Sequence, residues 1–303
     1  MAFRGNPHRT YSVPPGLAGI VVTVRHRLGA DTLQIISSWS GTRAAAARKR
    51  AHYSGPQPGN PTDSSLTMRG VRTLVLWDID HTLIEMSGFS GEIYASVFLA
   101  VTGQPMERLA DMSGRTDLAI TVETLRLHGV APTPETLQAF GSALAAGFSA
   151  RREEIPAYGR VLAGARAALE ALGTRPDVVQ SVLTGNMEGI AVEKLTAFGL
   201  DRFVDFEAGA YGFDHTDRPP LVRLARERAA RKYGEDFDQS TTVLIGDTPL
   251  DVEAGHRGGA RVVAVATGSS DVEALRAAGA ELVLTDLRET SDVVRAVLGV
   301  SAA

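Results

Sequence analysis

The stretch VRTLVLWDIDHTLI, residues 71–84, decides the fold of this chain. Its apolar run is typical of a buried strand and leads directly into Asp78, with Asp80 and Thr82 at the next alternate positions. Burying an unpaired carboxylate is heavily penalised, so two of them need a cation or dense hydrogen bonding. At the carboxyl end of a strand, they lie where α/β sheets bind ligands. One carboxylate can attack while the other handles protons, and a hard divalent cation can hold both. The alternative is an acidic turn, because aspartate is common in turns.

The composition is that of an ordinary soluble globular protein: 303 residues, 44% hydrophobic and 22% charged. A net charge of −4 does not indicate nucleic acid as a partner. No apolar run approaches the roughly 20 residues of a membrane span. The chain has no cysteine, which excludes disulfides, thiolate catalysis and cysteine-ligated metals and fits a cytoplasmic location. Nothing in the sequence indicates the oligomeric state.

Residues 1–67 differ from the rest of the chain, because they hold eight Arg and Lys residues against two Asp and are rich in Pro, Gly and Ser. Such a composition buries little apolar surface, so we expect a disordered basic extension. A basic targeting arm is the alternative. Met68 lies just before the first predicted strand, and we expect a chain that begins there to fold completely.

Beyond Met68, short apolar runs alternate with helical patterns. The predicted strands are Thr73–Trp77, Val178–Leu183, Val204–Phe206, Thr242–Ile245, Arg261–Ala266 and Leu282–Leu284. The predicted helices between them are Gly159–Leu172, Glu188–Phe198, Leu221–Tyr233, Leu250–Arg257, Asp271–Ala278 and Asp286–Val297. This alternation predicts an α/β fold, a Rossmann-like parallel sheet with helices on both faces. Strands rich in Val, Ile and Leu fit burial on both faces.

One segment breaks the alternation. From Ser90 to Arg152 only helical spacing is present, in Gly91–Val101, Thr116–His128 and Pro134–Arg152. We therefore expect an all-helical domain over residues 87–155, inserted into a core domain formed by residues 68–86 and 156–303. Such an insert would sit over the end of the first strand as a lid.

A second strand end carries Thr184, followed by Gly185, Asn186 and then a helix. A hydroxyl beside the backbone N–H groups of a helix start makes an anion site. An ordinary capping turn is the alternative, because Thr and Asn are common there.

A third strand end reads GDTPLD, with Asp247 after the strand and Asp251 in the first helical turn. Helical spacing could bring both carboxylates to one side, where they would complete an oxygen-rich Mg²⁺ site. The alternatives are a helix N-cap for Asp247 and compensation of the helix dipole by Asp251.

Between the second and third of these strand ends, a polar loop holds Arg218, which precedes two prolines and then a helix. A cation here could neutralise phosphate charge in the site. A solvated loop arginine is the alternative, and Arg223 is the fallback candidate for the same role.

Taken in order, DIDHT at 78–82, Thr184, the cation at 218 and GDTPLD at 246–251 resemble the motifs of the haloacid dehalogenase superfamily of phosphatases. The resemblance runs from about Arg72 to the C-terminus. The helical insert is similar to the cap of the subgroup that includes phosphoglycolate phosphatases and β-phosphoglucomutases.

This resemblance implies roles for the first-strand residues. Asp78 is expected to be the nucleophile that forms an aspartyl-phosphate. Asp80 is expected to protonate the leaving oxygen, then to activate water, and to bind Mg²⁺ through its main-chain carbonyl. Thr82 is expected to support the loop.

The same resemblance implies roles for Arg218 and for the residues at the other strand ends. Thr184 and the amides of Gly185 and Asn186 are expected to bind the phosphoryl group. Arg218 is expected to orient Asp78 and offset charge. The expected role of Asp247 is to bind Mg²⁺, and Asp251 is expected to bind it directly or through a neighbouring group.

Two residues depart from the family pattern. Arg218 stands where lysine is more common, and a guanidinium is not equivalent to an ammonium. His81 stands where glycine is common, and we expect it to shape the loop rather than to reach the entrance. His215 and His256 are expected at the surface.

The acid at Asp80 favours an oxygen leaving group, because halide leaves without a proton. A phosphatase acting on a small phosphorylated metabolite is therefore expected. A phosphomutase, a haloacid dehalogenase and a catalytically silent binding protein are the alternatives. The segment SGRTDLAIT, residues 113–121, resembles one near the substrate in phosphoglycolate phosphatase-like relatives. Arg115 could read a substrate carboxylate there, or pair with Asp117 or a surface acid.

Overall fold

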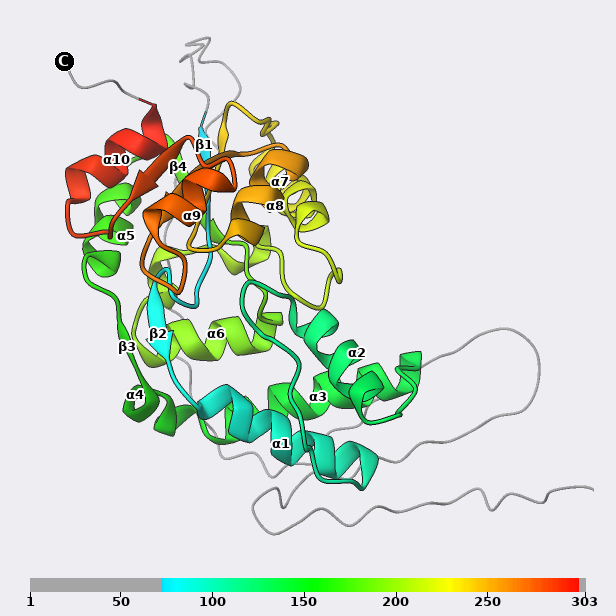
Figure 1. The fold of residues 1–303 in the computed structure, drawn as a ribbon. Helices are drawn as coiled ribbons and strands as arrows, with labels where there is room; N and C mark the ends of the chain where they lie inside the picture. The colour runs from blue at the N-terminus through cyan, green and yellow to red at the C-terminus, as the bar shows by residue number, and fades with distance from the viewer. Residues whose placement is uncertain (1–71, 300–303) are drawn as a thin grey trace, which may run out of the picture. The chain divides into compact units, whose positions relative to one another are not determined.

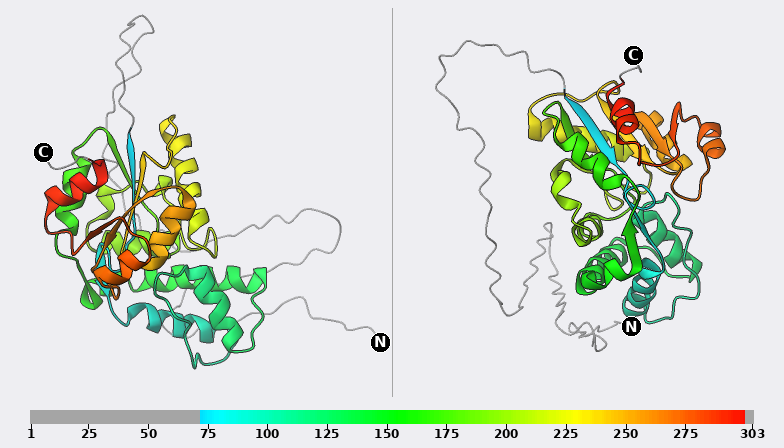
Figure 2. Two further views of the ribbon diagram at one scale, coloured as in Figure 1. Left: turned by 45° about the horizontal axis from the view of Figure 1, so that its top comes forward. Right: turned by 90° about the vertical axis from the view of Figure 1, so that its left-hand side faces the viewer.

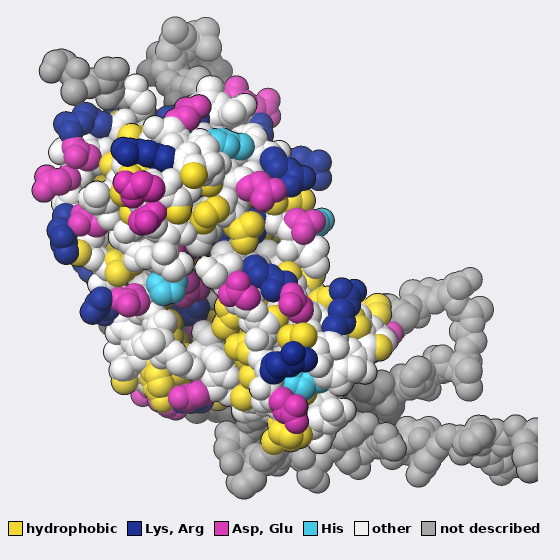
Figure 3. Space-filling model, in the orientation of Figure 1, with side chains coloured by type: hydrophobic (Ala, Val, Ile, Leu, Met, Phe, Trp, Pro, Cys, Tyr) yellow, Lys and Arg dark blue, Asp and Glu magenta, His cyan; other side chains and the backbone are white. Residues whose placement is uncertain are grey.

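The computed structural model describes residues 72–299. The expectations for residues 1–67 and for a chain starting at Met68 lie outside the described residues. Within the described part, no helix is long and apolar enough to cross a membrane. Figure 3 shows acidic and basic side chains interspersed over the face in view.

A five-stranded sheet, with the order β4-β1-β5-β6-β7, forms the centre of the fold, and each of its neighbouring pairs is parallel. Its strands are β1 (Thr73–Trp77), β4 (Val178–Val182), β5 (Thr242–Gly246), β6 (Arg261–Val265) and β7 (Leu282–Leu284). β1 lies between β4 and β5, with Trp77 in register with Val182 and with Ile245. The carboxyl ends of these three strands therefore meet at one edge.

Helices cover both faces of this sheet (Figures 1 and 2). They are α5 (Ala165–Gly173), α6 (Glu188–Ala197), α7 (Pro219–Tyr233), α8 (Pro249–Gly258), α9 (Val272–Ala277) and α10 (Thr290–Leu298), with short 3-10 turns η2 (Asp201–Phe203) and η3 (Phe206–Ala208). The α/β fold predicted from the alternation is confirmed.

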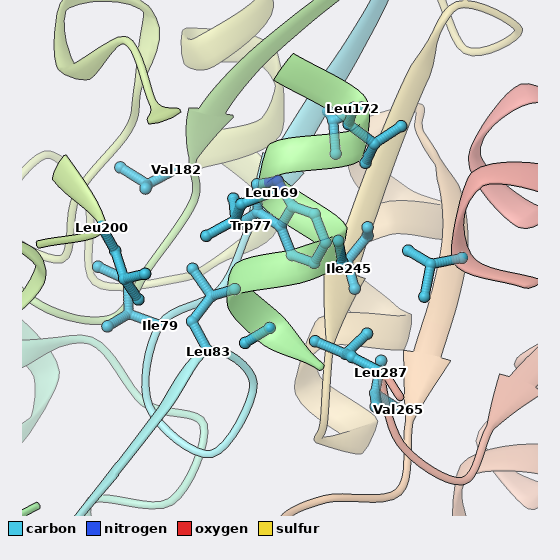
Figure 4. Packing of buried hydrophobic residues seen from close by; sticks show 14 of the residues in the cluster. Trp77, Ile79, Leu83, Leu169, Leu172, Val182, Leu200, Ile245, Val265 and Leu287 are labelled. Carbon is cyan, nitrogen blue, oxygen red and sulfur yellow. The ribbon is translucent and has the colours of Figure 1, made fainter. Parts of the chain in front are cut away.

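Successive β1 residues enter different apolar clusters, because side chains alternate along a strand. Val75 and Trp77 pack with α5 and α10, whereas Leu74 and Leu76 pack with α7 and α8. Figure 4 shows Trp77 with Leu169 beside it. The Trp77 indole donates to the buried Gln180 Oε1 at 3.0 Å, so its one polar group is satisfied. β1 is thus held from both faces, which fixes the position of the residue that follows it.

The segment between β1 and β4 contains α1 (Phe89–Thr102), α2 (Asp117–Leu127), α3 (Pro134–Ala150), the 3-10 turn η1 (Arg152–Glu154) and α4 (Ile155–Tyr158). Its apolar core includes Phe89, Phe140 and Phe148, joined by Ile190 from α6. Thr116 and Thr133 cap α2 and α3 by accepting from the amides of their first turns. The helical character predicted for this segment is confirmed.

One short strand precedes the helical segment and another follows it. β2 (Ile84–Met86) pairs antiparallel with β3 (Gly159–Val161), so the chain enters and leaves the helical segment through one small ladder. The helix predicted from Gly159 therefore begins only at Ala165. Gly164 precedes it at φ 84°, and a Cβ there would lie 2.0 Å from the Leu287 carbonyl oxygen. The helix predicted from Asp286 likewise begins later, at Thr290.

The strand predicted at Val204–Phe206 is wrong. Residues 201–203 and 206–208 form 3-10 turns instead. This part of the chain touches β4 only through separate contacts, such as the hydrogen bond from the Asp205 amide to the Gln180 carbonyl at 2.8 Å. A single bridge between Leu183 and Ala210 follows. With turns between these contacts, no continuous ladder forms.

Candidate active site

Asp78 lies at the carboxyl end of β1 with only 5% of its surface exposed. Its amide donates to the Ile245 carbonyl at 2.8 Å, which extends the β1–β5 pairing by one residue and directs the chain out of the sheet. The next turn contains His81 at φ 61°, the left-handed conformation in which glycine is usual. The His81 carbonyl accepts from Thr267 Oγ1 at 2.5 Å. The backbone of His81 thus shapes the turn after β1 and connects it to Thr267.

Arg218 reaches this carboxylate from the loop before α7. Its Nη2 donates to Asp78 Oδ1 at 3.2 Å and also to Asp251 Oδ1, and 5% of Arg218 is exposed. Its Nη1 donates to the Gly114 carbonyl in the helical segment at 3.3 Å. Arg223, by contrast, has a side chain that is 75% exposed and pairs with Glu227. The structure therefore brings Arg218, and not Arg223, to the predicted position.

Asp247 and Asp251 come from the end of β5 and the first turn of α8. One carboxylate oxygen from each of these two residues and from Asp78 lie within 4.8 Å of one another. Asp251 is already held on both oxygens, since its Oδ2 accepts from Thr248 N at 3.0 Å and Thr248 Oγ1 at 2.7 Å while Oδ1 faces Arg218. Within residues 72–299, the Asp247 carboxylate accepts one side-chain hydrogen bond, from Thr82 Oγ1 at 3.3 Å. Asp78 and Asp247 are thus the pair best placed to hold a cation.

The electrostatics of this trio fit a divalent cation. Burial raises the pKa of Asp78, and Asp251 and Asp80 add to that rise while Arg218 opposes it. Burial raises the pKa of Asp247 as well, followed by repulsion from Asp78 and Asp251. Three buried carboxylates facing one guanidinium are unfavourable unless protons or a cation neutralise them. Carboxylate oxygens are the ligands that Mg²⁺ prefers, so the residues present fit the predicted ion.

A fully buried hydroxyl at the end of β4 belongs to Thr184. Its Oγ1 accepts from the Asn186 amide at 3.2 Å and from Asn186 Nδ2 at 2.8 Å. Both contacts use the oxygen as an acceptor, so the hydroxyl proton is available to a bound anion. The carbonyl of Arg115 lies so close to Gly185 that a Cβ on Gly185 would be 2.1 Å from it. The predicted phosphoryl-binding loop is therefore covered by the helical segment.

Asp80 has partners that the sequence did not reveal. Lys194 Nζ on α6 donates to both carboxylate oxygens of Asp80, at 2.8 and 2.7 Å, and Asn186 Nδ2 donates to one of them at 2.7 Å. Burial opposes ionisation of Asp80, but Lys194 and Asn186 outweigh it and hold the pKa of Asp80 below its ordinary value. The sequence gives only a partial signal for Lys194, which falls at helical spacing among the apolar residues Ile190, Ala191 and Leu195 of α6 but does not reveal its partner.

The helical segment touches this site through the loop that leads into α2. The Asp117 amide donates to the Gly185 carbonyl at 2.7 Å, and its carboxylate accepts from the Met187 amide at 2.8 Å and from Tyr94 at 2.8 Å. The Arg115 side chain pairs with Glu123 at 2.6 Å. Of the two sequence-based interpretations of Arg115, the structure displays the pairing with a surface acid.

Comparisons with known proteins bear on the fold of this chain. Residues 221–290 match a family model described as HAD-hydrolase-like. A search of curated proteins gave no match. Among solved structures, CbbY from Rhodobacter sphaeroides in complex with phosphate aligns with a TM-score of 0.55 and 19% identity, over 72% of this chain and 96% of that one.

Two other solved structures show the same fold. A protein provisionally assigned as a β-phosphoglucomutase from Bacteroides vulgatus has a TM-score of 0.54 and 21% identity, over 76% of this chain and 90% of that one. A predicted phosphoglycolate phosphatase from Haemophilus somnus has a TM-score of 0.50 and 18% identity, over 74% of this chain and 98% of that one. Residues 221–290 are thus similar in sequence to HAD-like hydrolases, and the described part of the chain shares the fold of these solved structures.

Proposed function

We propose that this protein is a Mg²⁺-dependent phosphatase that hydrolyses a small phosphate monoester through an aspartyl-phosphate on Asp78. One observation carries the proposal: Asp78 is buried at the end of β1 between the guanidinium of Arg218 and the carboxylate of Asp247. A second acid, Asp80, lies two residues further on with a cation of its own. A nucleophile, an acid–base group and charge compensation are what phosphoryl transfer needs.

In the first step, a carboxylate oxygen of Asp78 attacks phosphorus, and the bond from phosphorus to the ester oxygen breaks. Asp80 gives its proton to the departing oxygen, so the product leaves as an alcohol. Arg218 orients Asp78 and offsets negative charge, while the Thr184 hydroxyl and the Gly185 and Asn186 amides bind phosphoryl oxygens.

In the second step, Asp80 takes a proton from water, whose oxygen attacks phosphorus. The bond from phosphorus to Asp78 then breaks, which releases inorganic phosphate, restores the Asp78 carboxylate and leaves Asp80 protonated for the next cycle. Asp78, Asp247 and the Asp80 carbonyl would hold Mg²⁺, with Asp251 fixing Arg218 beside them. When bound, the ion reduces the repulsion between the phosphate dianion and the carboxylate nucleophile.

Residues 87–155 form the cap in this proposal. Its loop meets the core at Gly185 through Asp117 and at Arg218 through Gly114. Product release therefore requires these contacts to open, as expected for a cap that excludes water during the reaction.

The substrate class is a small phosphorylated metabolite, and 2-phosphoglycolate is the first ester to test because of the resemblance at residues 113–121. A phosphomutase is the second candidate, since a protein assigned as a β-phosphoglucomutase shares the fold. A mutase would convert one sugar phosphate into its isomer with little release of inorganic phosphate.

The test is phosphate release from p-nitrophenyl phosphate and a panel of small phosphate esters, with Mg²⁺ and with EDTA. We expect turnover with Mg²⁺ that EDTA abolishes, and the panel ranks the substrates. Isomerisation of a sugar phosphate without phosphate release would favour the mutase. No reaction of folded protein with any ester would refute both, and haloacid turnover would be measured next.

A further inference from the structure

Lys194 is a deeply buried cation in contact with Asp80. Only 2% of its surface is exposed, although it lies on α6 among apolar neighbours. Its ammonium makes three hydrogen bonds, to the two carboxylate oxygens of Asp80 and, at 2.8 Å, to Asn186 Oδ1. A lysine has three N–H donors, so none remains for a substrate. Lys194 can therefore affect the reaction only through its partners.

Asn186 completes the arrangement around Asp80. Lysine can only donate, so the amide oxygen of Asn186 faces Lys194 and its Nδ2 faces Asp80 and Thr184. One amide thus connects the buried ammonium, the proposed acid–base carboxylate and the proposed phosphoryl-binding hydroxyl. Asn186 and Lys194 lie on α6 and on the loop directly before it, so one continuous segment of the chain holds the Asp80 carboxylate beside the proposed phosphoryl site.

We propose that Lys194 is a positioning residue that, together with Asn186, holds the Asp80 carboxylate in the orientation from which it exchanges protons with the reacting oxygen. This inference rests on the proposed phosphatase function. A free aspartate side chain samples several staggered rotamers, whereas catalytic groups must be held to about 0.5 Å of their productive geometry. Three hydrogen bonds on one carboxylate, two from Lys194 and one from Asn186, restrict it to one orientation.

The burial of the two partners argues against a purely structural role. The Asp80 side chain is 34% exposed, so water can solvate it without Lys194, whereas the Lys194 side chain is 3% exposed. The lysine thus bears most of the desolvation cost of the pair. An apolar residue in place of Lys194 would leave behind a carboxylate that water can reach, and not a fully buried unpaired charge, so the stability cost of that change is limited. A charge kept there against this cost points to a role in the reaction.

The decisive experiment compares kcat/KM for two esters in the wild type and in Lys194→Met, with Mg²⁺ present. kcat/KM reports the steps up to departure of the leaving group, and p-nitrophenolate departs without a proton whereas an alkoxide needs one. We expect Lys194→Met to lower kcat/KM about 100-fold for the best alkyl phosphate of the panel and less than about fivefold for p-nitrophenyl phosphate. Equal losses for the two esters, or no loss, would overturn the inference.

Lys232→Met is the matched control. This lysine also pairs with carboxylates, Asp205 and Glu207, but it lies on α7 away from the site and its side chain is 36% exposed. We expect both rates to match those of the wild type. Thermal unfolding should place Lys194→Met within about 4 °C of the wild type. A larger loss of stability together with equal losses of kcat/KM for the two esters would make Lys194 structural.

A second variant pair tests whether Lys194 acts through Asp80. In an Asp80→Asn background, adding Lys194→Met should change kcat/KM for the alkyl phosphate by less than about twofold, because coupled residues are not additive. If the double variant instead lost kcat/KM by the product of the two single-variant losses, the inference would be contradicted. If Lys194→Met does not fold, Asn186→Ala removes the amide contacts to Lys194 and Asp80 together with the one to Thr184, and it should still lower kcat/KM more for the alkyl phosphate than for p-nitrophenyl phosphate. A wild type inactive on both esters would instead refute the phosphatase itself.

Discussion

Arg218 and Asp78 form a buried ion pair at 3.2 Å, each side chain less than a tenth exposed, that joins the loop before α7 to the end of β1. The same guanidinium nitrogen also binds Asp251 in the first turn of α8. Three elements that are far apart in sequence are thus held around one positive charge. Removing this charge leaves the carboxylates to repel one another in a site of low polarity.

Arg218→Met should therefore lose both stability and activity. Breaking a buried pair by removing one partner costs about 3–5 kcal/mol, measured as the free energy of unfolding in urea without metal. Arg218→Lys should fold and retain part of the activity, because it keeps the charge but not the second donor group. Arg223→Met, at an exposed position of the α7 helix that follows this loop, is the control and should be nearly neutral. Equal behaviour of the two methionine variants would show that Arg218 does not hold the site.

Mg²⁺ should stabilise the protein more at high pH than at low pH. The pKa values of Asp78 and Asp247 are about 7 and about 8 in the folded, metal-free protein, against an ordinary value of 3.8. Because the folded state then binds more protons than the unfolded chain, metal-free stability falls as pH rises from about 4 to about 8. Mg²⁺ binds the deprotonated carboxylates and offsets this fall.

The check is the melting temperature with Mg²⁺ minus that with EDTA, measured from about pH 5 to about pH 8. We expect the difference to grow with pH in the wild type. It should be small at every pH in Asp247→Asn, which removes one proposed ligand and one buried charge. A difference independent of pH in the wild type would argue against Asp78 and Asp247 as the binding pair.

Gly185→Ala should loosen the contact between the cap and the phosphoryl-binding loop. The new Cβ would lie 2.1 Å from the Arg115 carbonyl oxygen, so the backbone of one side must move. We expect kcat/KM to fall at least about tenfold, because misplacing reacting groups by about 1 Å costs about that much or more. Gly91→Ala on α1 meets nothing within 4 Å and should leave the activity unchanged. Comparable rates for the two variants would mean that the cap does not close as described.

If Arg115 binds a carboxylate on the substrate, substitutions of Arg115 and of Glu123 should change KM for that substrate in opposite directions. Arg115→Ala should raise KM for 2-phosphoglycolate far more than for p-nitrophenyl phosphate. Glu123→Gln releases Arg115 from its 2.6 Å ion pair and should lower KM for the same ester. If both variants shift KM for the two esters equally, the ion pair is only a surface feature and substrate recognition lies elsewhere.

Much of the site could be predicted because parallel strands end at a common edge. Asp78, Thr184 and Asp247 each follow a strand, and β1 lies between β4 and β5, so their meeting follows from the sheet order. Arg218 was identified by its place before two prolines and is now seen in contact with Asp78. Whether these residues have the roles implied by the family resemblance is left to the experiments above.

Other features depend on contacts that local patterns do not encode. The pairing of Lys194 with Asp80 spans 114 positions, and a lysine in a helix is usually solvated. β2 and β3 are each three residues long, which is too short for an alternating pattern to be recognised. The apolar run at Val204–Phe206 indicated a strand, but hydrogen bonding to β4 there is interrupted by turns.

The most direct test of the account is to trap the covalent intermediate on Asp78. Wild-type protein would be mixed with the best phosphate ester and Mg²⁺, quenched in acid within one turnover, and its peptides analysed by mass spectrometry. We predict one phosphoryl group on the peptide that contains Asp78, none in Asp78→Asn, and no phosphate release by that variant. Turnover by Asp78→Asn, or wild-type turnover with phosphate on a different residue, would contradict the central claim that Asp78 is the nucleophile.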